Sequence, residues 1–385
     1  MADKQRKIVL INQAVNYLTI GICNEFFNAF NDVTLITGSV HAQGEELHPE
    51  IKVVHINKWK EEHGFGKLMI YIKALWSFYY ILMTKYRKHE VFFISVPPMA
   101  YLLNLVLSHR FSMLIWDVYP DSLKITGMKE SHPVYRFWSR LNRRSFKKAF
   151  AIITIGDKMA DLLSKYVNRE KLIIQPIWSI FQGNDKIKKR DNPFIKEQQL
   201  EGKFVVQYSG NIGLTHNVEV LIDIASAMKD YEHIVFQIIG RGPRKKQLEQ
   251  RVRDEKIPNC RFLPFQSDAM FPYSLSAADL GVVILDETTS KGSVPSKSYN
   301  LMSYGIPALY IASGDSELFE YALKYRHAEC FGKNHLQEII KYISDLAQDK
   351  VLYNNYAKNA LKASEHFRRD NAGKIVAKYV NLPLD

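Results

Sequence analysis

Short apolar runs alternate with longer amphipathic stretches along the first half of the chain. The runs occupy residues 7–12, 33–37, 53–56, 91–95, 113–117 and 151–155. Continuous apolar runs of this length, bounded by polar residues, Gly or Pro, are typical of parallel strands that are buried on both faces. Helical patterns lie between them, so the sequence predicts a doubly wound α/β domain, which binds ligands at the carboxyl ends of its strands.

The second half repeats this alternation after a polar interval. Residues 181–202 are rich in Lys, Asp, Asn and Gln without clear periodicity, and strands are predicted afterwards at 204–209, 234–239, 260–263, 280–285, 308–311 and 329–331. A chain of 385 residues exceeds one ordinary core. We therefore expect an N-terminal Rossmann-like domain (1–180), a linker (181–202), a C-terminal Rossmann-like domain (203–365) and a C-terminal helix (366–385) that packs back on the first domain.

Two predicted helices of the first half have unusual patterns. Residues 67–88 are apolar on nearly every face, but the apolar run is shorter than the roughly twenty residues of a membrane span. This helix is either buried in the domain or lies in a membrane surface. Residues 135–150 interleave aromatic residues with six Arg and Lys residues, which is typical of a solvated helix face or of a helix that docks on anionic headgroups.

Charge and cysteine content narrow the classes of partner and compartment. The net charge of +12 favours an anionic partner, and no nucleic-acid-binding motif accompanies the basic helix. The three cysteines, Cys23, Cys260 and Cys330, have no zinc or disulfide spacing. The apolar run near the N-terminus is too short for a signal peptide, so we expect a cytoplasmic protein. Because no nucleic-acid-binding motif is present, we do not expect it to bind nucleic acid.

One stretch, residues 292–307, has the features of an anion site. Ser296 is a candidate N-cap, which leaves the backbone N–H groups of 297–299 without intrahelical partners. Those N–H groups, the helix dipole and the Lys297 ammonium suit a phosphate or diphosphate. The alternative is an ordinary capped helix that binds nothing. Glycine turns near Gly210 and Gly240 fall on the same predicted sheet edge, and this convergence favours a nucleotide pocket.

In the first half, the carboxyl end of one strand carries two candidate acidic residues. Asp117 and Asp121 follow the predicted strand at 113–117. An α/β site needs a polar side chain at such a position.

Several motifs together resemble those of a known family, the retaining glycosyltransferases of family 4, which have the GT-B fold. They are Tyr208-Ser-Gly-Asn-Ile-Gly-Leu, Ile239-Gly-Arg-Gly-Pro, Ala277-Ala-Asp-Leu, Val294-Pro-Ser-Lys-Ser-Tyr, Met302-Ser-Tyr-Gly-Ile-Pro, Asp117-Val-Tyr-Pro-Asp-Ser-Leu and Ile153-Thr-Ile-Gly-Asp-Lys-Met. The resemblance implies an α/β protein of two Rossmann-like domains that face each other across a cleft. The most similar sub-branch transfers sugars from nucleotide donors to lipid-linked or saccharide acceptors in bacterial surface polysaccharide synthesis.

The resemblance also implies roles for particular residues. A donor nucleotide-diphosphate sugar, with UDP favoured, would be the co-substrate, and no cofactor or metal is expected. Asp117 would lie beside the transferred sugar and acceptor as the catalytic candidate. Retention would follow from attack on the face that the diphosphate leaves, with the diphosphate as base. The expected donor-binding residues are Gly210, Asn211, Gly213, Arg241, Phe265, Ser296, Lys297 and Asn300.

The chain departs from the family pattern at identifiable positions. Gly292 and Asn300 stand where many relatives have two glutamates eight residues apart, and Asn211 and His216 stand near where many have a basic pair. The carboxamide of Asn300 can still bond ribose hydroxyls.

We therefore expect a retaining hexosyl- or N-acetylhexosaminyltransferase, peripheral on the inner face of the cell membrane, that docks on anionic lipid through helix 135–150. The alternatives are a non-catalytic GT-B-like subunit that binds nucleotide sugars and a nucleotide-sugar epimerase, since fold does not fix function.

Overall fold

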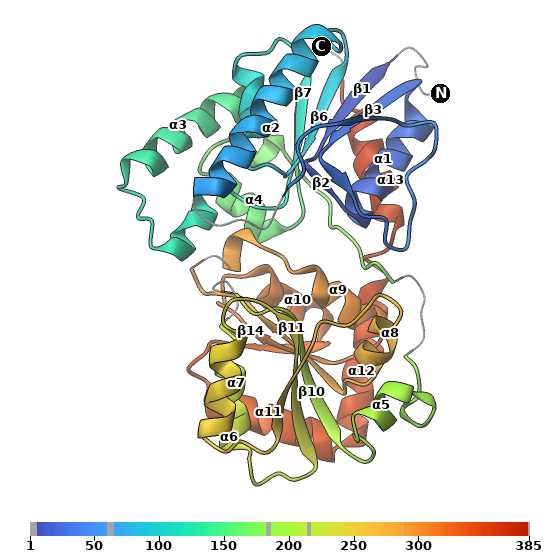
Figure 1. The fold of residues 1–385 in the computed structure, drawn as a ribbon, viewed down its shortest axis with the longest axis vertical. Coiled ribbons are helices and arrows are strands. Elements are labelled where there is room, and N and C mark those ends of the chain that lie inside the picture. The colour runs from blue at the N-terminus through green and yellow to red at the C-terminus, as the bar shows by residue number, and fades with distance from the viewer. Residues whose placement is uncertain (1–5, 60–64, 182–185, 214–216, 289, 384–385) are drawn as a thin grey trace. The chain divides into compact units, whose positions relative to one another are not determined.

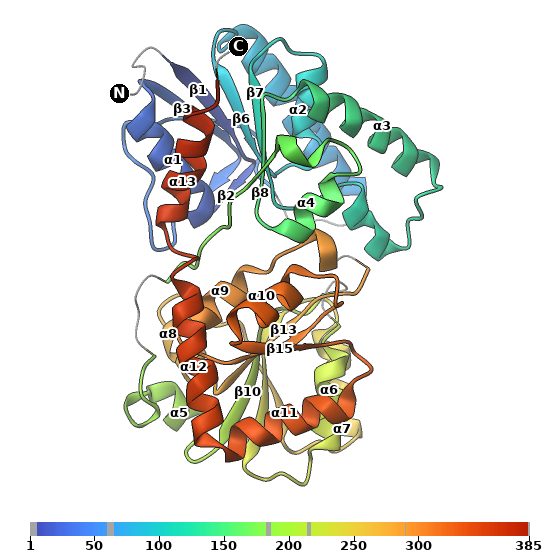
Figure 2. The ribbon, with the colours of Figure 1, turned by 180° about the vertical axis from the view of Figure 1, so that it is seen from behind.

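The computed structural model describes residues 6–59, 65–181, 186–213, 217–288 and 290–383. The chain forms two compact units, the first of Met1–Ile180 with Arg368–Asp385 and the second of Phe181–Phe367. Each unit is built around one parallel sheet with helices on its faces (Figures 1 and 2).

The first unit contains a seven-stranded parallel sheet with the strand order β5-β3-β1-β6-β7-β8-β9. Its strands are β1 (Lys7–Ile11), β3 (Asp32–Thr37), β5 (Lys52–His55), β6 (Glu90–Ile94), β7 (Phe111–Ile115), β8 (Ala151–Thr154) and β9 (Leu172–Ile174). The central strands are almost wholly buried: residues 8–11 of β1 are all 0% exposed. Burial on both faces explains why these strands are continuous apolar runs in the sequence.

The helices of the first unit connect the strands and cover the sheet. They are α1 (Tyr17–Ala29), α2 (Phe65–Thr84), α3 (Pro133–Lys148), α4 (Asp157–Leu163) and α13 (Asp370–Val380), with 3₁₀ turns η1 (Ala100–Leu105), η2 (Asp121–Thr126) and η3 (Arg169–Lys171). A two-stranded ladder joins β2 (Ala14–Val15) to β4 (Ser39–Val40).

The C-terminal helix α13 lies beside α1 in the first unit, as both views show (Figures 1 and 2). Just before α13, Arg369 donates to Glu45 (2.6 Å) and to Glu25 (2.9 Å). The Arg369 guanidinium also lies over the Trp178 ring, 5.7 Å from its centroid. These contacts fix the returning chain against the first sheet's helices.

The second unit contains a six-stranded parallel sheet with the order β12-β11-β10-β13-β14-β15. Its strands are β10 (Phe204–Asn211), β11 (Ile234–Arg241), β12 (Cys260–Leu263), β13 (Leu280–Ile284), β14 (Ala308–Ile311) and β15 (Ala328–Phe331). Its helices are α5 (Pro193–Glu197), α6 (Glu219–Ala227), α7 (Lys245–Asp254), α8 (Phe271–Ser276), α9 (Ser296–Ser303), α10 (Glu317–Tyr325), α11 (Leu336–Gln348) and α12 (Lys350–Ser364), with η4 (Lys189–Asp191) and η5 (Ser290–Gly292).

The interval 181–202, which we expected to be a linker, belongs to the second unit. Its helix α5 packs into that unit through Phe194 and Ile195, each 1% exposed, and Leu200 is fully buried beside them. The Lys189 ammonium forms an ion pair with Asp279. The sequence did not predict that these three apolar residues are buried, because a helix as short as α5 produces no clear hydrophobic periodicity.

The two architectures agree with the predicted fold class, an α/β protein with two Rossmann-like doubly wound domains. Among the described residues, no helix is long and apolar enough to cross a membrane. The helix α2 is not wholly buried in the unit, which was one of the two expectations from the sequence. One stripe, Ala74, Phe78 and Leu82, is fully buried, whereas Trp76 and Tyr80 on the opposite side are 68% and 67% exposed.

Candidate functional site

The candidate site is the carboxyl edge of the second sheet, where glycines let two strands stay paired to their last residues. Gly210 pairs with Gly240, and Asn211 pairs with Arg241, at the ends of β10 and β11. A Cβ atom on Gly240 would overlap the carbonyl oxygen of Gly210. Only glycine permits this close approach of the two backbones.

The turns that follow these strands are also constrained by glycine. Gly210 and Gly242 both have φ of +153°, which side-chain-bearing residues rarely adopt. A Cβ on Gly242 would overlap the Ile212 carbonyl. The Ile212 N–H donates to the Arg241 carbonyl at 2.8 Å, so the two turns are joined to each other. The result is an edge of bare backbone that a ligand can approach closely.

The helix α9 follows β13 and begins at this sheet edge, but its cap differs from the prediction. The N-cap position is Pro295, and no side chain caps the helix. Ser296 is the first helical residue, and its side chain is exposed. The Ser298 N–H donates to the Pro295 carbonyl at 3.1 Å, so it is not an open donor as predicted. Proline suits this entry because its φ is compatible with the start of a helix.

Lys297 lies on the first turn of α9, and its buried ammonium forms no ion pair with any residue that the structure describes. Its Nζ has no hydrogen-bond partner within the described part of the chain. The ammonium lies over the Tyr208 ring, whose centroid is 4.3 Å from Nζ. A Cβ on Gly210 would be 2.7 Å from the same nitrogen. Lys297 is thus aimed at the glycine edge of β10.

Burial gives this lysine an altered proton affinity. Although part of the side chain is exposed, Nζ itself is buried. Burial lowers the pKa of Lys297 to about 8, because removal from water penalises the charged form. The cation–π contact with Tyr208 offsets only part of that cost. Burial of an unpaired ammonium is unfavourable, so binding of an anion beside it would be stabilising.

Tyr208 is a further functional candidate, to which the motif Tyr208-Ser-Gly-Asn-Ile-Gly-Leu had assigned no role. It is fully buried in β10, and its hydroxyl donates to the Asn211 carbonyl at 2.7 Å. Burial raises the pKa of Tyr208, which keeps the hydroxyl protonated as a donor. Its position in the sequence could have indicated this role, because Tyr208 lies two residues before the Gly210 turn, in the first strand of the second sheet. Tyr208 supports both the turn and Lys297.

The remaining donor-binding candidates border the same edge. Asn211 is exposed, with Nδ2 2.9 Å from where a Cβ on Gly213 would lie. The Arg241 guanidinium lies over the ring of Phe265, 5.4 Å from its centroid. Phe265 is 57% exposed, so much of its side chain is accessible near the end of β12. His216 lies outside the described residues.

Asn300 and Gly292 stand on either side of Lys297 in the sequence. Asn300 is half-buried one turn along α9, and its carbonyl accepts from Ser303 Oγ at 2.9 Å. Gly292 is buried in η5. The carboxamide of Asn300 is the one side chain of this pair that can offer hydrogen bonds to a ligand.

The two acidic candidates of the first unit have different surroundings. Asp117 lies two residues after the end of β7 and is exposed. Asp121 is 4% exposed and accepts from Tyr135 (2.7 Å), from Lys165 (3.1 Å) and from Tyr166. Asp121 is therefore committed to internal contacts, whereas Asp117 is available to a ligand. Asp117 belongs to the first unit, whereas the donor-binding candidates belong to the second.

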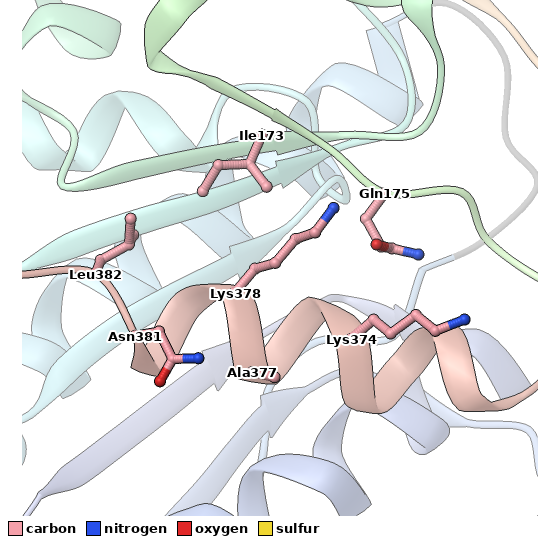
Figure 3. Close-up of a pocket in the computed structure, with 7 residues that line it drawn as sticks. All are labelled: Ile173, Gln175, Lys374, Ala377, Lys378, Asn381 and Leu382. Carbon is pink, nitrogen blue, oxygen red and sulfur yellow. The ribbon is translucent and has the colours of Figure 1, made fainter.

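Two cavities accompany these features. A cavity of about 80 Å³ lies at the ends of β13 and β14, and its lining includes Asn217, Asp286 and Lys333. A wider groove of about 520 Å³ lies in the first unit between the edge strand β9 and α13. Lys374 and Lys378 of α13 are among the residues that line it (Figure 3). The Lys378 ammonium donates to the Ile174 carbonyl at 2.8 Å. Neither cavity contains a residue from the predicted site.

The comparison with protein families matches most of the second unit. Residues 189–363 match the family described as Glycosyl transferases group 1. That segment contains Tyr208, Lys297 and the whole glycine edge.

Two curated relatives match by sequence. The probable glycosyltransferase WbjE of Pseudomonas aeruginosa is 26% identical over 219 residues, which are 56% of this chain and 54% of WbjE. The putative colanic acid biosynthesis glycosyl transferase WcaI of Escherichia coli (strain K12) is 27% identical over 199 residues, which are 51% of this chain and 49% of WcaI. The matched part of the chain thus spans about half the length of these curated relatives.

Among solved structures, Anabaena HepE in complex with UDP-glucose superposes with a TM-score of 0.71 at 13% identity, over 97% of this chain and 99% of that one. A likeness at this identity establishes the fold. The protein has the GT-B fold, as the sequence predicted.

Proposed function

We propose that this protein is a glycosyltransferase that moves a sugar from a nucleotide-diphosphate donor to a saccharide or lipid-linked acceptor in bacterial surface polysaccharide synthesis. The observation that carries the proposal is the buried, unpartnered Lys297 ammonium against Tyr208 at the glycine edge of β10. The match of residues 189–363 to the glycosyl transferases supports it, as does the similarity to WcaI, a putative glycosyl transferase of colanic acid biosynthesis.

In this proposal the donor diphosphate lies between the glycine edge and α9. Its negative charge satisfies Lys297, and the bare backbone at Gly210 leaves room for phosphate oxygens. Gly213 and the exposed Asn211 border the same space, and Ser296 offers an exposed hydroxyl on the first turn of α9. These groups are fixed before the donor arrives, so they stabilise charge without reorganisation.

The nucleoside part is assigned to the neighbouring groups. The exposed Phe265 ring, over which the Arg241 guanidinium lies, suits stacking with an aromatic base. The Asn300 carboxamide suits the ribose hydroxyls. UDP is the favoured nucleotide, because HepE, which shares the fold, is described in complex with UDP-glucose.

We assign Asp117 to the sugar and acceptor side of the reaction. The acceptor hydroxyl oxygen bonds to the anomeric carbon on the face from which the diphosphate departs, and the carbon–oxygen bond to the diphosphate breaks. The hydroxyl proton passes to the departing diphosphate, and the anomeric configuration is retained. The chain's own contribution to this step is charge stabilisation, chiefly by Lys297, as the diphosphate leaves.

The proposal is tested with purified protein and a panel of UDP and GDP sugars, with and without a lipid-linked saccharide acceptor. We expect transfer or slow donor hydrolysis with one UDP sugar, and loss of that turnover in Lys297→Ala. Tight nucleotide binding without turnover would instead support a non-catalytic subunit, in line with Gly292 and Asn300 at the two positions where relatives often have glutamates. Interconversion of the free nucleotide sugar without an acceptor would support an epimerase.

A further inference from the structure

Exposed apolar side chains are concentrated on one part of the first unit. Of the thirteen large hydrophobic residues that are exposed in the described part of the chain, eight belong to α2, α3 or the end of η1. These eight are Leu68, Met69, Trp76, Tyr80, Met83, Val106, Val134 and Phe137. We call the surface that they form, with the cations between them, the α2–α3 face.

On α2 the exposed residues form a stripe of their own. Trp76 and Tyr80, four residues apart, are 68% and 67% exposed, and Met69 and Met83 continue the same side of the helix. The opposite stripe, which includes Phe78, is fully buried. The buried stripe packs α2 into the unit, whereas Trp76 and Tyr80 are mostly exposed and contribute little to that packing.

The segment η1 joins α2 to α3 in a fixed arrangement. The Tyr101 hydroxyl on η1 donates to Asn142 (2.8 Å) and accepts from Trp138 (2.9 Å), and Asn104 donates to the Ser145 carbonyl (2.8 Å). The segment η1 also packs against α2. The two long helices lie next to each other in both views (Figures 1 and 2). The two helices thus belong to one well-supported part of the unit.

The charge of this surface has one sign. Residues 65–89 and 131–156 contain no Asp or Glu. The exposed cations of these segments are Lys73, Lys85, Arg87, Lys88, Arg136, Arg140, Arg143, Arg144, Lys147 and Lys148. Such a field is repulsive toward a second copy of itself and attractive toward an anionic surface.

In the structure, most aromatic residues of α3 are buried, whereas its Arg and Lys residues are exposed. Tyr135, Trp138 and Phe146 point into the unit and are at most 9% exposed, so they cannot reach a lipid surface. On α3 the exposed apolar residues are Val134 and Phe137. Helix α3 therefore contributes mainly charge, whereas α2 contributes the amphipathic aromatic rings that favour the boundary of a bilayer.

We propose that the α2–α3 face docks on a bilayer rich in anionic lipid, with Trp76 and Tyr80 in the headgroup boundary and the cations of α3 on the lipid phosphates. A basic surface with exposed aromatic side chains binds both components of such a membrane, and apolar burial and electrostatic attraction add. Docking does not depend on the proposed sugar transfer, because it uses none of the residues at the glycine edge.

The experiment is co-sedimentation of the full-length protein, without nucleotide, on vesicles of phosphatidylcholine alone or with about one third phosphatidylglycerol. We expect binding to the mixed vesicles and weak binding to phosphatidylcholine. The double variant Trp76→Ser/Tyr80→Ser should lose roughly tenfold or more in affinity. The triple variant Arg143→Gln/Arg144→Gln/Lys147→Gln should lose vesicle affinity by a similar factor or more. Added salt should weaken vesicle binding less in this variant than in the wild type.

Matched controls come from the second unit. Leu323→Ser/Val351→Ser removes two apolar residues that are 60% and 72% exposed, and Lys229→Gln/Lys246→Gln/Lys362→Gln removes three exposed cations. Both controls should bind vesicles as the wild type does. Equal loss in the control and α2–α3 variants would overturn the assignment of this face. Vesicle binding that neither test variant reduces would do the same.

A second readout separates docking from other uses of the face. Brominated acyl chains should quench Trp76 fluorescence, so the quenching should fall in Trp76→Phe while binding persists. Concentration-dependent self-association that Trp76→Ser/Tyr80→Ser abolishes, without vesicle binding by the wild type, would identify the face as a contact between copies and reject the proposal. Circular dichroism checks that each variant is folded.

Discussion

The Lys297 ammonium lies 4.3 Å from the centroid of the Tyr208 ring, and no hydrogen-bond acceptor in the described part of the chain reaches it. Tyr208 belongs to the first strand of the second sheet and Lys297 to a helix that follows the fourth. Their contact turns two separated motifs into one site. A cation in this setting is stabilised by an anionic ligand more than by the protein itself.

Replacing Lys297 with alanine should weaken binding of UDP much more than binding of uridine. A charge-assisted hydrogen bond contributes roughly 1.5–3 kcal/mol, so we expect about a 10- to 100-fold loss for UDP. Isothermal titration calorimetry with both ligands measures the difference. Ser296→Ala is the matched variant and should lose only a few-fold. An equal loss for UDP and uridine would rule out the phosphate role.

UDP affinity should decrease as the pH rises through about 8. The free protein has a Lys297 pKa of about 8 because Nζ is buried, and only the protonated form attracts the diphosphate. Affinity should be nearly constant between pH 7 and 7.5 and should fall by up to about tenfold per pH unit well above 8. Titrations from pH 7 to 9.5 test this. In Lys297→Met the affinity should be low and should not change across this range.

The same lysine should destabilise the protein when no ligand is bound. Its folded pKa is below its unfolded value of 10.5, so the unfolded state holds more protons between pH 8 and 10.5, and stability rises with pH in that window. The penalty is complete below pH 8. Lys297→Met should therefore raise the free energy of unfolding at pH 7 by roughly 1–2 kcal/mol. Urea unfolding should show this gain shrinking by pH 9.5, and a gain of the same size at both pH values would contradict the assignment.

Gly240→Ala should be strongly destabilising, because its Cβ would overlap the Gly210 carbonyl oxygen between the paired strands. Relief requires the strands to separate at the site, and we expect a loss of about 2–4 kcal/mol in the free energy of unfolding. Gly314→Ala is the control, since nothing lies within 4 Å of its Cβ position. It should change stability by less than about 0.5 kcal/mol. Urea midpoints compare the two variants, and similar midpoints would show that the strands do not need the glycine.

Asp121→Ala should destabilise the first unit by about 3 kcal/mol, because two buried tyrosine hydroxyls and one exposed ammonium lose a shared acceptor. The donors are Tyr135, Tyr166 and Lys165. Burial, together with Asp121, raises the pKa of Tyr166, so this hydroxyl remains a donor at neutral pH. Glu130→Ala removes an exposed partner of Lys124 and Lys165 and should cost less than about 1 kcal/mol. Thermal unfolding of both variants gives the comparison, and equal costs would mean that burial of Asp121 is not decisive.

The sequence by itself determined the alternation of strands and helices, because parallel strands buried on both faces must be continuous apolar runs. The runs at 7–12 and 234–239 coincide with β1 and β11 to within two residues. It also marked the glycine turns, since only glycine fits where backbones meet. The GT-B fold was predictable on these grounds together with the motif resemblance.

Only the tertiary structure decided which side chains meet and which remain exposed. Periodicity could not show that Lys297 lies on Tyr208, because the two residues are on different elements whose side-chain directions depend on packing. It could not show that α5 packs into the second unit through Phe194, since one short helix gives no period. Nor could it divide α2 into a buried stripe with Phe78 and an exposed stripe with Trp76. Both stripes are apolar in the sequence, and only the neighbouring elements determine which one is covered.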